Sequence, residues 1–260
     1  MLSYQHAYHA GSPADLHKHI ALAELLTLLT RKARPISYLE SHAGRAVYDL
    51  ASPEALKTGE AARGIGKLPE TVLASEGAFW SALRWCRARH GPNAYPGSPM
   101  IAQALLRLQD RIALCELHPA EHAALKECLA GPGIAVHRRD GHEGLPGLCP
   151  PQPRRGLALI DPSYEIKGEY AQTAETALAT LRKWPEGVVM VWYPILPEAR
   201  HTALTGPIEA AGIGGMLRHE VTYREAPARG MTGSGLIFLN LPHGADKLLR
   251  DAWQACSPVF

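Results

Sequence analysis

The feature that most constrains the fold is a regular alternation of short apolar runs with longer helical stretches. Runs rich in Ile, Val and Leu occupy residues 36–40, 112–116, 134–138, 156–160 and 188–192. Such short, continuously apolar runs predict parallel strands buried on both faces. Helices are predicted from Pro13 onward and over about 98–109, 119–130, 169–183 and 197–211. This alternation predicts an open α/β sheet with helices on both faces.

The C-terminal part of the chain departs from this alternation. Two further strands are predicted at 216–223 and 235–241, and the segment APARGMTGSG within their connection is too short and too glycine-rich for a crossover helix. The last strand is therefore expected to run antiparallel to the others. Seven strands ending in an antiparallel hairpin indicate the class I methyltransferase version of the Rossmann-like, doubly wound sheet rather than the all-parallel dehydrogenase version.

A segment of about 50 residues separates the first predicted strand from the next helix of the sheet. We expect a catalytic domain formed by residues 1–48 and 96–260, with a small helical subdomain inserted at 49–95. One of its two predicted helices is FWSALRWCRARH. The insertion is either a lid held by its aromatic residues or a substrate-facing arm whose arginines meet phosphates, namely Arg84, Arg87 and Arg89.

Composition narrows the cellular setting and the partners. The 260 residues are 46% hydrophobic, and no apolar run approaches the roughly 20 residues that a membrane-spanning helix requires. Five scattered cysteines without a C-x-x-C pair indicate reduced thiols. We therefore expect a cytoplasmic protein that does not bind membranes. The net charge of +2 is compatible with a local nucleic-acid-binding surface and does not demand one.

Acidic residues follow the predicted strands. Glu40, Glu116, Asp140 and Asp161 each end an apolar run or lie within a few residues of its end. Ligands bind at the carboxyl ends of the strands in open α/β sheets, so these side chains are expected to converge on one crevice. Clustered carboxylates need donors or a positive ligand, and S-adenosylmethionine supplies ribose hydroxyls, an adenine amine and a sulfonium charge. The alternative is that each acid caps the helix that follows it.

The sequence Asp161-Pro162-Ser163-Tyr164 directly follows the run at 156–160. An adenine amine is a poor nucleophile because its lone pair is delocalised into the ring, so an enzyme must accept hydrogen bonds from its protons as it pyramidalises. Asp161 and the Pro162 carbonyl are suited to this, and Tyr164 offers a ring on which an extruded base can stack. The alternative is an ordinary turn at the end of a strand.

Blocks along the whole chain carry a resemblance to a known family. They are MLSYQHAYHAGSPADLHKH, YLESHAGRAVY, YPGSPMIAQALLR, CELHP, RRDG, RRGLALIDPSYE, WYP and RGMTGSG. In these blocks the chain resembles the bacterial methyltransferases that modify adenine 2030 of 23S ribosomal RNA. The resemblance implies S-adenosylmethionine as the cofactor, transfer to the exocyclic amine and Asp161 as the catalytic acceptor, in a motif with Pro162 and Tyr164.

The same resemblance implies two sets of binding residues. The cofactor set is His19, His42, Gly44, Ser98, Glu116, Asp140, Gly141 and Asp161. The substrate set is Tyr4, His6 and Lys18, and Lys18 is suited to bind a phosphate. Glu116 is placed to accept the ribose hydroxyls, and Asp140 the adenine amine, beside a glycine that permits close backbone approach.

The chain departs from the family pattern at a few positions. Ser163 replaces a second proline, Glu40 replaces an aspartate, and Arg45-Ala46 replace Ala-Gly in the cofactor loop. Alanine adopts positive φ less readily than glycine, and the bulky Arg45 is expected to crowd the methionine end of the cofactor.

Rival functions remain open from the sequence. A DNA adenine methyltransferase uses a similar motif but usually carries a larger target-reading region. A catalytically degenerate RNA-binding protein would tolerate the loop departures. A metal-dependent hydrolase would use the histidines near the start, His6, His9, His17 and His19, with Asp15.

We expect a monomer that binds no metal. The expected substrate is 23S ribosomal RNA free of ribosomal proteins, because an unpaired base is easier to extrude.

Overall fold

The computed structural model describes residues 5–224 and 230–256. Its main sheet has seven strands in the order β5-β4-β1-β6-β7-β9-β8. The first five run parallel, and β9 is antiparallel to both of its neighbours. The strands are β1 (Ser37–Glu40), β4 (Arg111–Cys115), β5 (Ile134–His137), β6 (Gly156–Ile160), β7 (Val188–Ile195), β8 (Leu217–Thr222) and β9 (Gly233–Leu239). All seven predicted strands and the antiparallel last strand are confirmed.

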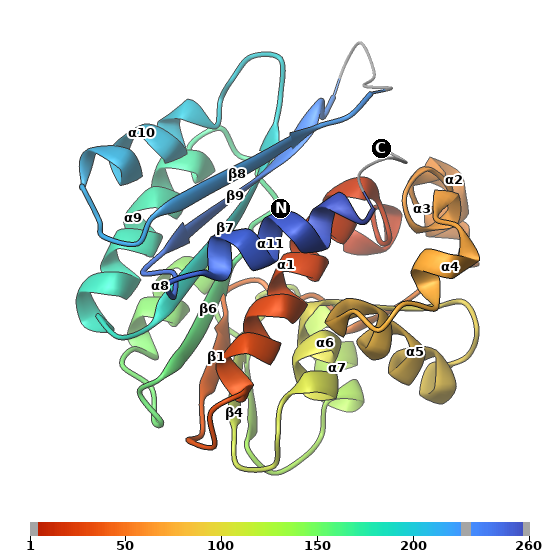
Figure 1. The fold of residues 1–260 in the computed structure, drawn as a ribbon, viewed down its shortest axis with the longest axis horizontal. Helices are drawn as coiled ribbons and strands as arrows, with labels where there is room; N and C mark the ends of the chain where they lie inside the picture. Colours follow the sequence, from red (N-terminus) through yellow and green to blue (C-terminus); the bar gives the residue numbers. More distant parts are fainter. Residues whose placement is uncertain (1–4, 225–229, 257–260) are drawn as a thin grey trace.

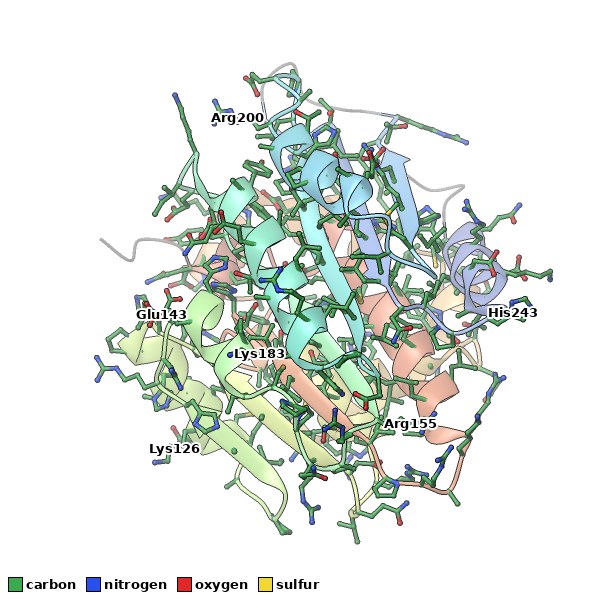
Figure 2. All side chains as sticks on the ribbon, turned by 90° about the vertical axis from the view of Figure 1, so that its left-hand side faces the viewer. Lys126, Glu143, Arg155, Lys183, Arg200 and His243 are labelled. Carbon is green, nitrogen blue, oxygen red and sulfur yellow. The ribbon has the colours of Figure 1, made fainter. Side chains whose placement is uncertain are left out.

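Helices cover both faces of the sheet (Figure 1). One layer holds α1 (Pro13–Thr30), α6 (Ser98–Leu105), α7 (Pro119–Cys128) and α11 (Ala245–Gln254). The other, which faces the viewer in Figure 2, holds α8 (Gly141–Gly147), α9 (Glu169–Lys183) and α10 (Thr202–Ala210). Each layer encloses its own hydrophobic core against the sheet, as a doubly wound fold requires. No helix in the described ranges is long and apolar enough to cross a membrane.

Helix α1 is buried on nearly all sides, because α11, α5 and α6 pack around it. It begins where predicted: the Ser12 hydroxyl accepts from the Asp15 backbone N–H, and Pro13 occupies the first turn. Burial on all sides explains why its polar residues at positions 15 and 17–19 are buried too. Such buried polar groups require partners within the protein.

The segment between β1 and α6 contains the expected helices and an additional strand pair. Strands β2 (Val47–Asp49) and β3 (Ala94–Pro96) pair antiparallel and bracket it, and they were not predicted. The helical elements between them are α2 (Pro53–Thr58), α3 (Glu60–Arg63), the 3-10 turn Ile65–Lys67, α4 (Glu70–Leu73) and α5 (Ala78–His90). A further 3-10 turn, His6–Tyr8, precedes α1. The division into 1–48 with 96–260 and an inserted 49–95 stays a prediction.

Helix α5 packs its aromatic residues into the core and leaves arginines on the surface. Phe79 and Trp80 are 1% and 5% exposed and belong to the same core as α1. The Arg84 guanidinium donates to the Leu73 and Ser75 carbonyls, and Arg89 stacks on Trp85 at 3.8 Å. Both arginines are nevertheless exposed, so the choice between a lid and a substrate-facing arm stays a prediction.

Candidate active site

The carboxylate of Asp161, immediately after β6, forms a buried ion pair with Lys18 of α1. The Lys18 Nζ lies 2.6 Å from Asp161 Oδ2 and 3.0 Å from Asp15 Oδ1. Lys18 is 4% exposed, and its aliphatic stem is enclosed with it. Burial alone lowers the pKa of Lys18, but the two carboxylates outweigh burial and raise it, so the ammonium stays charged.

The second carboxylate of this cluster, Asp15, is held in place from several sides. Its Oδ2 accepts from the Gly11 backbone N–H at 3.0 Å and lies 2.9 Å from His6 Nε2. Burial raises the pKa of Asp15, but His6, Lys18 and His19 together keep it well below its usual range. From the sequence, Asp15 was a candidate only for a metal ligand. The structure instead makes it the partner that fixes Lys18 beside Asp161.

This position corrects the prediction that Lys18 binds an RNA phosphate. A side chain buried between two carboxylates has no exposed face for a phosphate, so Lys18 acts on Asp161 rather than on the RNA backbone. His6 of the predicted substrate set does lie at this cluster, through Asp15. Tyr4, the third member of that set, falls outside the described residues.

The rest of the motif after β6 makes a strained and well-supported turn. Tyr164 has a φ of 55°, a conformation uncommon for a residue with a side chain. Its hydroxyl donates to the Trp192 carbonyl at 2.6 Å, and its ring packs 4.5 Å from that of Tyr170. Pro162 is buried. The ring of Trp192 in β7 also lies 5.6 Å from Lys18 Nζ, so this half-buried aromatic residue lies beside the ion pair of Lys18 with Asp161. Within the sequence, only its place in the run WYP pointed to it.

The loop after β1 joins the ends of three other strands. The Gly44 backbone N–H donates to Glu116 Oε2 at 2.8 Å, which ties the loop to the end of β4. The Ser41 hydroxyl accepts from the Asp161 backbone N–H at 3.4 Å, which ties it to the end of β6. A Cβ on Gly141 would stand 2.0 Å from the Ser41 carbonyl oxygen, so only glycine permits this approach of α8. The predicted convergence of strand ends on one rim therefore occurs.

The four carboxylates on this rim differ in how they are satisfied. Asp140 caps α8, and its Oδ1 accepts from two backbone N–H groups while Oδ2 has no partner within the described ranges. Each oxygen of Glu116 accepts one backbone N–H, from Gly44 and His118, and burial raises the pKa of this carboxyl. Both acids therefore keep lone pairs for a ligand's hydroxyl or amine groups.

Glu40 differs from the other three because its hydrogen bonds are internal. It is fully buried, and its two oxygens accept from the hydroxyls of Tyr38 and Ser98. Burial raises the pKa of Glu40 to about 8, so the neutral acid is the stable form at pH 7. The Ser98 hydroxyl, predicted to line the cofactor site, is already committed to this acid.

Two histidines were predicted to line the cofactor site. The His19 Nδ1 lies 2.9 Å from the Tyr95 hydroxyl, and its ring stacks on Phe79, so this buried residue is satisfied inside the core. His42 lies in the loop after β1, with Nδ1 2.8 Å from the Ser41 hydroxyl. Burial and the neighbouring His142 lower the pKa of His42 to about 3, so its imidazole is neutral.

The departures from the family pattern have different consequences. Ala46 has a φ of 72°, so the alanine does adopt the left-handed conformation that favours glycine. Arg45 does not crowd the rim, which corrects that expectation. Its guanidinium makes a two-pronged pair with Glu121 of α7, with Nε 2.9 Å from Oε2.

The histidines near the start do not form a common metal site. They contact four separate groups: Asp15 for His6, Glu60 for His9, Ser234 and His219 for His17, and Tyr95 for His19. The ligand set proposed for a metal-dependent hydrolase is therefore not assembled.

The strand order with its single antiparallel strand, and a rim of acids at the carboxyl ends, define a class I methyltransferase fold. The family model described as "Ribosomal RNA large subunit methyltransferase D, RlmJ" matches residues 33–256. The chain belongs to this family.

Similar proteins of known sequence or structure agree with this assignment. Ribosomal RNA large subunit methyltransferase J of Escherichia coli is 35% identical over 93% of this chain and 88% of that protein. Its namesake from Haemophilus influenzae is 36% identical over 96% of this chain and 91% of its own length. A crystal structure of a Legionella pneumophila protein matches with a TM-score of 0.85 at 34% identity, covering 97% of this chain and 94% of that one.

Proposed function

We propose that this protein transfers a methyl group from S-adenosylmethionine to the exocyclic amine of adenine 2030 in 23S ribosomal RNA. The observation that carries the proposal is the Asp161 carboxylate, held by a buried ammonium in an Asp-Pro-Ser-Tyr turn beside the rim with Glu116 and Asp140. The two curated relatives, both ribosomal RNA large subunit methyltransferases, support the same activity. The rival hydrolase has no comparable support.

The chemistry of the rim fits the cofactor. Glu116 keeps a lone pair on each oxygen for ribose hydroxyls, and the free Oδ2 of Asp140 suits the adenine amine. His42 and Gly44 belong to the loop between these acids and Asp161, and Gly141 allows that loop to close on α8. The cofactor supplies an electrophilic methyl group. His19 and Ser98 would act through their neighbours, because their polar atoms are already bonded within the core.

The residues around Asp161 prepare the acceptor amine. Asp161 and the Pro162 carbonyl accept hydrogen bonds from the amine N–H groups as the nitrogen pyramidalises, which directs its lone pair toward the methyl group. Lys18 keeps Asp161 ionised and oriented, and Tyr164 and Trp192 offer aromatic surface for the extruded base. The surplus proton leaves through Asp161 or solvent, and no metal or covalent intermediate is needed.

Substrate form and setting follow from the same proposal. An adenine in RNA free of ribosomal proteins is extruded at a lower cost than one held in a duplex. The segment between β2 and β3 is small for reading a DNA major groove, which disfavours a DNA substrate. We further propose that the protein acts as a monomer in the cytoplasm.

The decisive experiment measures methylation of deproteinised large-subunit RNA that lacks the modification. Mass mapping of the RNA should place one methyl group on adenine 2030, and Asp161→Ala and Asp161→Asn should abolish it. Asp246→Ala, at an exposed aspartate of α11, is the matched control and should retain activity. Wild-type rates in both Asp161 variants would refute the role of Asp161, and a modified base elsewhere would refute the substrate.

A further inference from the structure

Three potential metal ligands from three separate elements lie close together near the rim of strand ends. They are His42 in the loop after β1, His142 in α8 and Glu169 at the start of α9. One ligand atom from each lies within 4.8 Å of the others. Within the described ranges this is the only such group. None of the steps of methyl transfer uses His142 or Glu169.

The hydrogen bonds around His142 determine which ring nitrogen carries a lone pair. The Thr176 hydroxyl donates its hydrogen to the Gln172 carbonyl at 2.8 Å, so toward His142 it can only accept. Nδ1 of His142, 2.9 Å from that hydroxyl, is therefore the protonated nitrogen of the neutral ring. Nε2 is left with a free lone pair. Metal-binding histidines are commonly oriented in this way by a hydrogen bond from their other nitrogen.

Two polar atoms of this group lack hydrogen-bond partners among the described residues. Nε2 of His142 and Oε2 of Glu169 are both buried without a partner, and the His142 side chain is only 5% exposed. The separation of 3.8 Å between His142 Nε2 and Glu169 Oε1 is too long for a hydrogen bond. Buried polar atoms are rarely left unsatisfied, so two of them within one group of potential ligands indicate that a ligand binds there.

The third ligand completes the set. The His42 ring lies 5.0 Å from that of His142, edge to face, and its Nδ1 can donate to the Ser41 hydroxyl. In that tautomer its Nε2 becomes a second imidazole ligand with a fixed orientation. Two imidazoles and one carboxylate suit a borderline divalent metal such as Zn²⁺ and not Mg²⁺, which prefers oxygen ligands.

We propose that His42, His142 and Glu169 bind a Zn²⁺ ion, with the fourth position left to water. This differs from the expectation from the sequence that the protein binds no metal. The ligands of a tetrahedral Zn²⁺ stand about 3.3 Å apart, so the three side chains close slightly around the ion. The ion would link the loop after β1 to α8 and α9, and it would occupy His42 from the side opposite Ser41.

Zinc binding is measured on untagged protein stripped with a chelator, without cofactor or RNA. The result is therefore independent of methyl transfer. Wild-type protein should take up one equivalent of Zn²⁺ in competition with a chromophoric chelator, and Co²⁺ should give the intense visible absorption of a tetrahedral site. Mg²⁺ should not compete.

Variants assign the ligands. His142→Gln and Glu169→Gln should each weaken Zn²⁺ binding by at least about tenfold, and Thr176→Val, which removes only the orienting hydrogen bond, by about 10- to 100-fold. His90→Gln, at an exposed histidine ending α5, should bind as the wild type does. Absence of a one-equivalent Zn²⁺ site, or equal affinity in wild type and Glu169→Gln, would overturn the proposal.

Discussion

Lys18 offers the sharpest test of how the site is held together. In Lys18→Met a neutral side chain of similar length replaces the ammonium, and Asp15 and Asp161 then face each other with no cation between them. Removing one partner of a buried ion pair typically costs about 3–5 kcal/mol. Because Lys18 is 4% exposed and Asp15 is 2% exposed, solvent compensates little, and the full range applies to the free energy of unfolding.

The measurement is equilibrium unfolding in urea at pH 7, followed by circular dichroism. Lys18→Met should lower the midpoint without changing the denaturant dependence, and should also lose methylation because Asp161 is no longer held. Adding Asp15→Asn should restore part of the stability, since it removes one of the two negative charges that face each other without the ammonium. Lys247→Met, at an exposed lysine of α11, serves as the control and should leave stability unchanged. A Lys18→Met midpoint equal to that of the wild type would refute the reasoning.

Other predictions concern the rim and its supports. Gly141→Ala should weaken cofactor binding and lower thermal stability, because the added Cβ would stand 2.0 Å from the Ser41 carbonyl oxygen. Calorimetry with S-adenosylhomocysteine measures the affinity, and a wild-type affinity in the variant would contradict this prediction. The folded-state pKa of Glu40, about 8, exceeds its unfolded value of 4.5, so the native state holds the extra proton and stability falls as pH rises between these values. Glu40→Gln should flatten that slope, which is at most about 1.4 kcal/mol per pH unit, and an unchanged slope in urea titrations would show that Glu40 is not its source. Arg45→Ala should lower the melting temperature, because it leaves Glu121 without its ion-pair partner. Cofactor affinity should stay unchanged, and a higher affinity in the variant would show that Arg45 does crowd the cofactor.

The sheet was predictable because its signal is local. Each parallel strand is a short apolar run, which is recognisable both in the fully buried β1 and β6 and in the partly buried edge strand β5. The antiparallel β9 followed from the length and composition of the connection before it. Outside the segment between β2 and β3, two helices were not predicted. Helix α8 contains Gly144, Pro146 and Gly147, which obscure a helical pattern, whereas α11 was missed although its buried residues Ala245, Leu249 and Trp253 lie four positions apart on one face. Strands β2 and β3 are three residues each, too short for a periodic signal.

The sequence predicted which acidic residues lie at the site, but it did not predict which side chains contact one another there. Strand ends placed Asp161, Asp140 and Glu116 correctly on one rim, because topology alone brings them together. The contact of Lys18 with Asp161 joins residues 143 positions apart, on a helix buried on nearly all sides, where an amphipathic pattern says nothing about which side chain faces the sheet. A lysine near an RNA enzyme's start therefore suggested a phosphate, and only packing showed that it neutralises acids instead.

The four acids on the rim show how a fold accommodates like charges in a small space. If all were ionised and unpaired, burial would force protons onto them. Each acid is stabilised differently. Asp161 pairs with a buried ammonium, Asp140 caps a helix N-terminus, and Glu116 accepts from two backbone N–H groups. Glu40 has a raised pKa that favours its neutral form. Asp140 and Glu116 keep oxygen lone pairs for a ligand, and Asp161 is held as a charged acceptor by the contact of Lys18 with its Oδ2. The proposed division between cofactor-binding acids and a catalytic acid therefore depends on which hydrogen-bond donors the neighbouring elements supply, because the acids themselves are chemically alike.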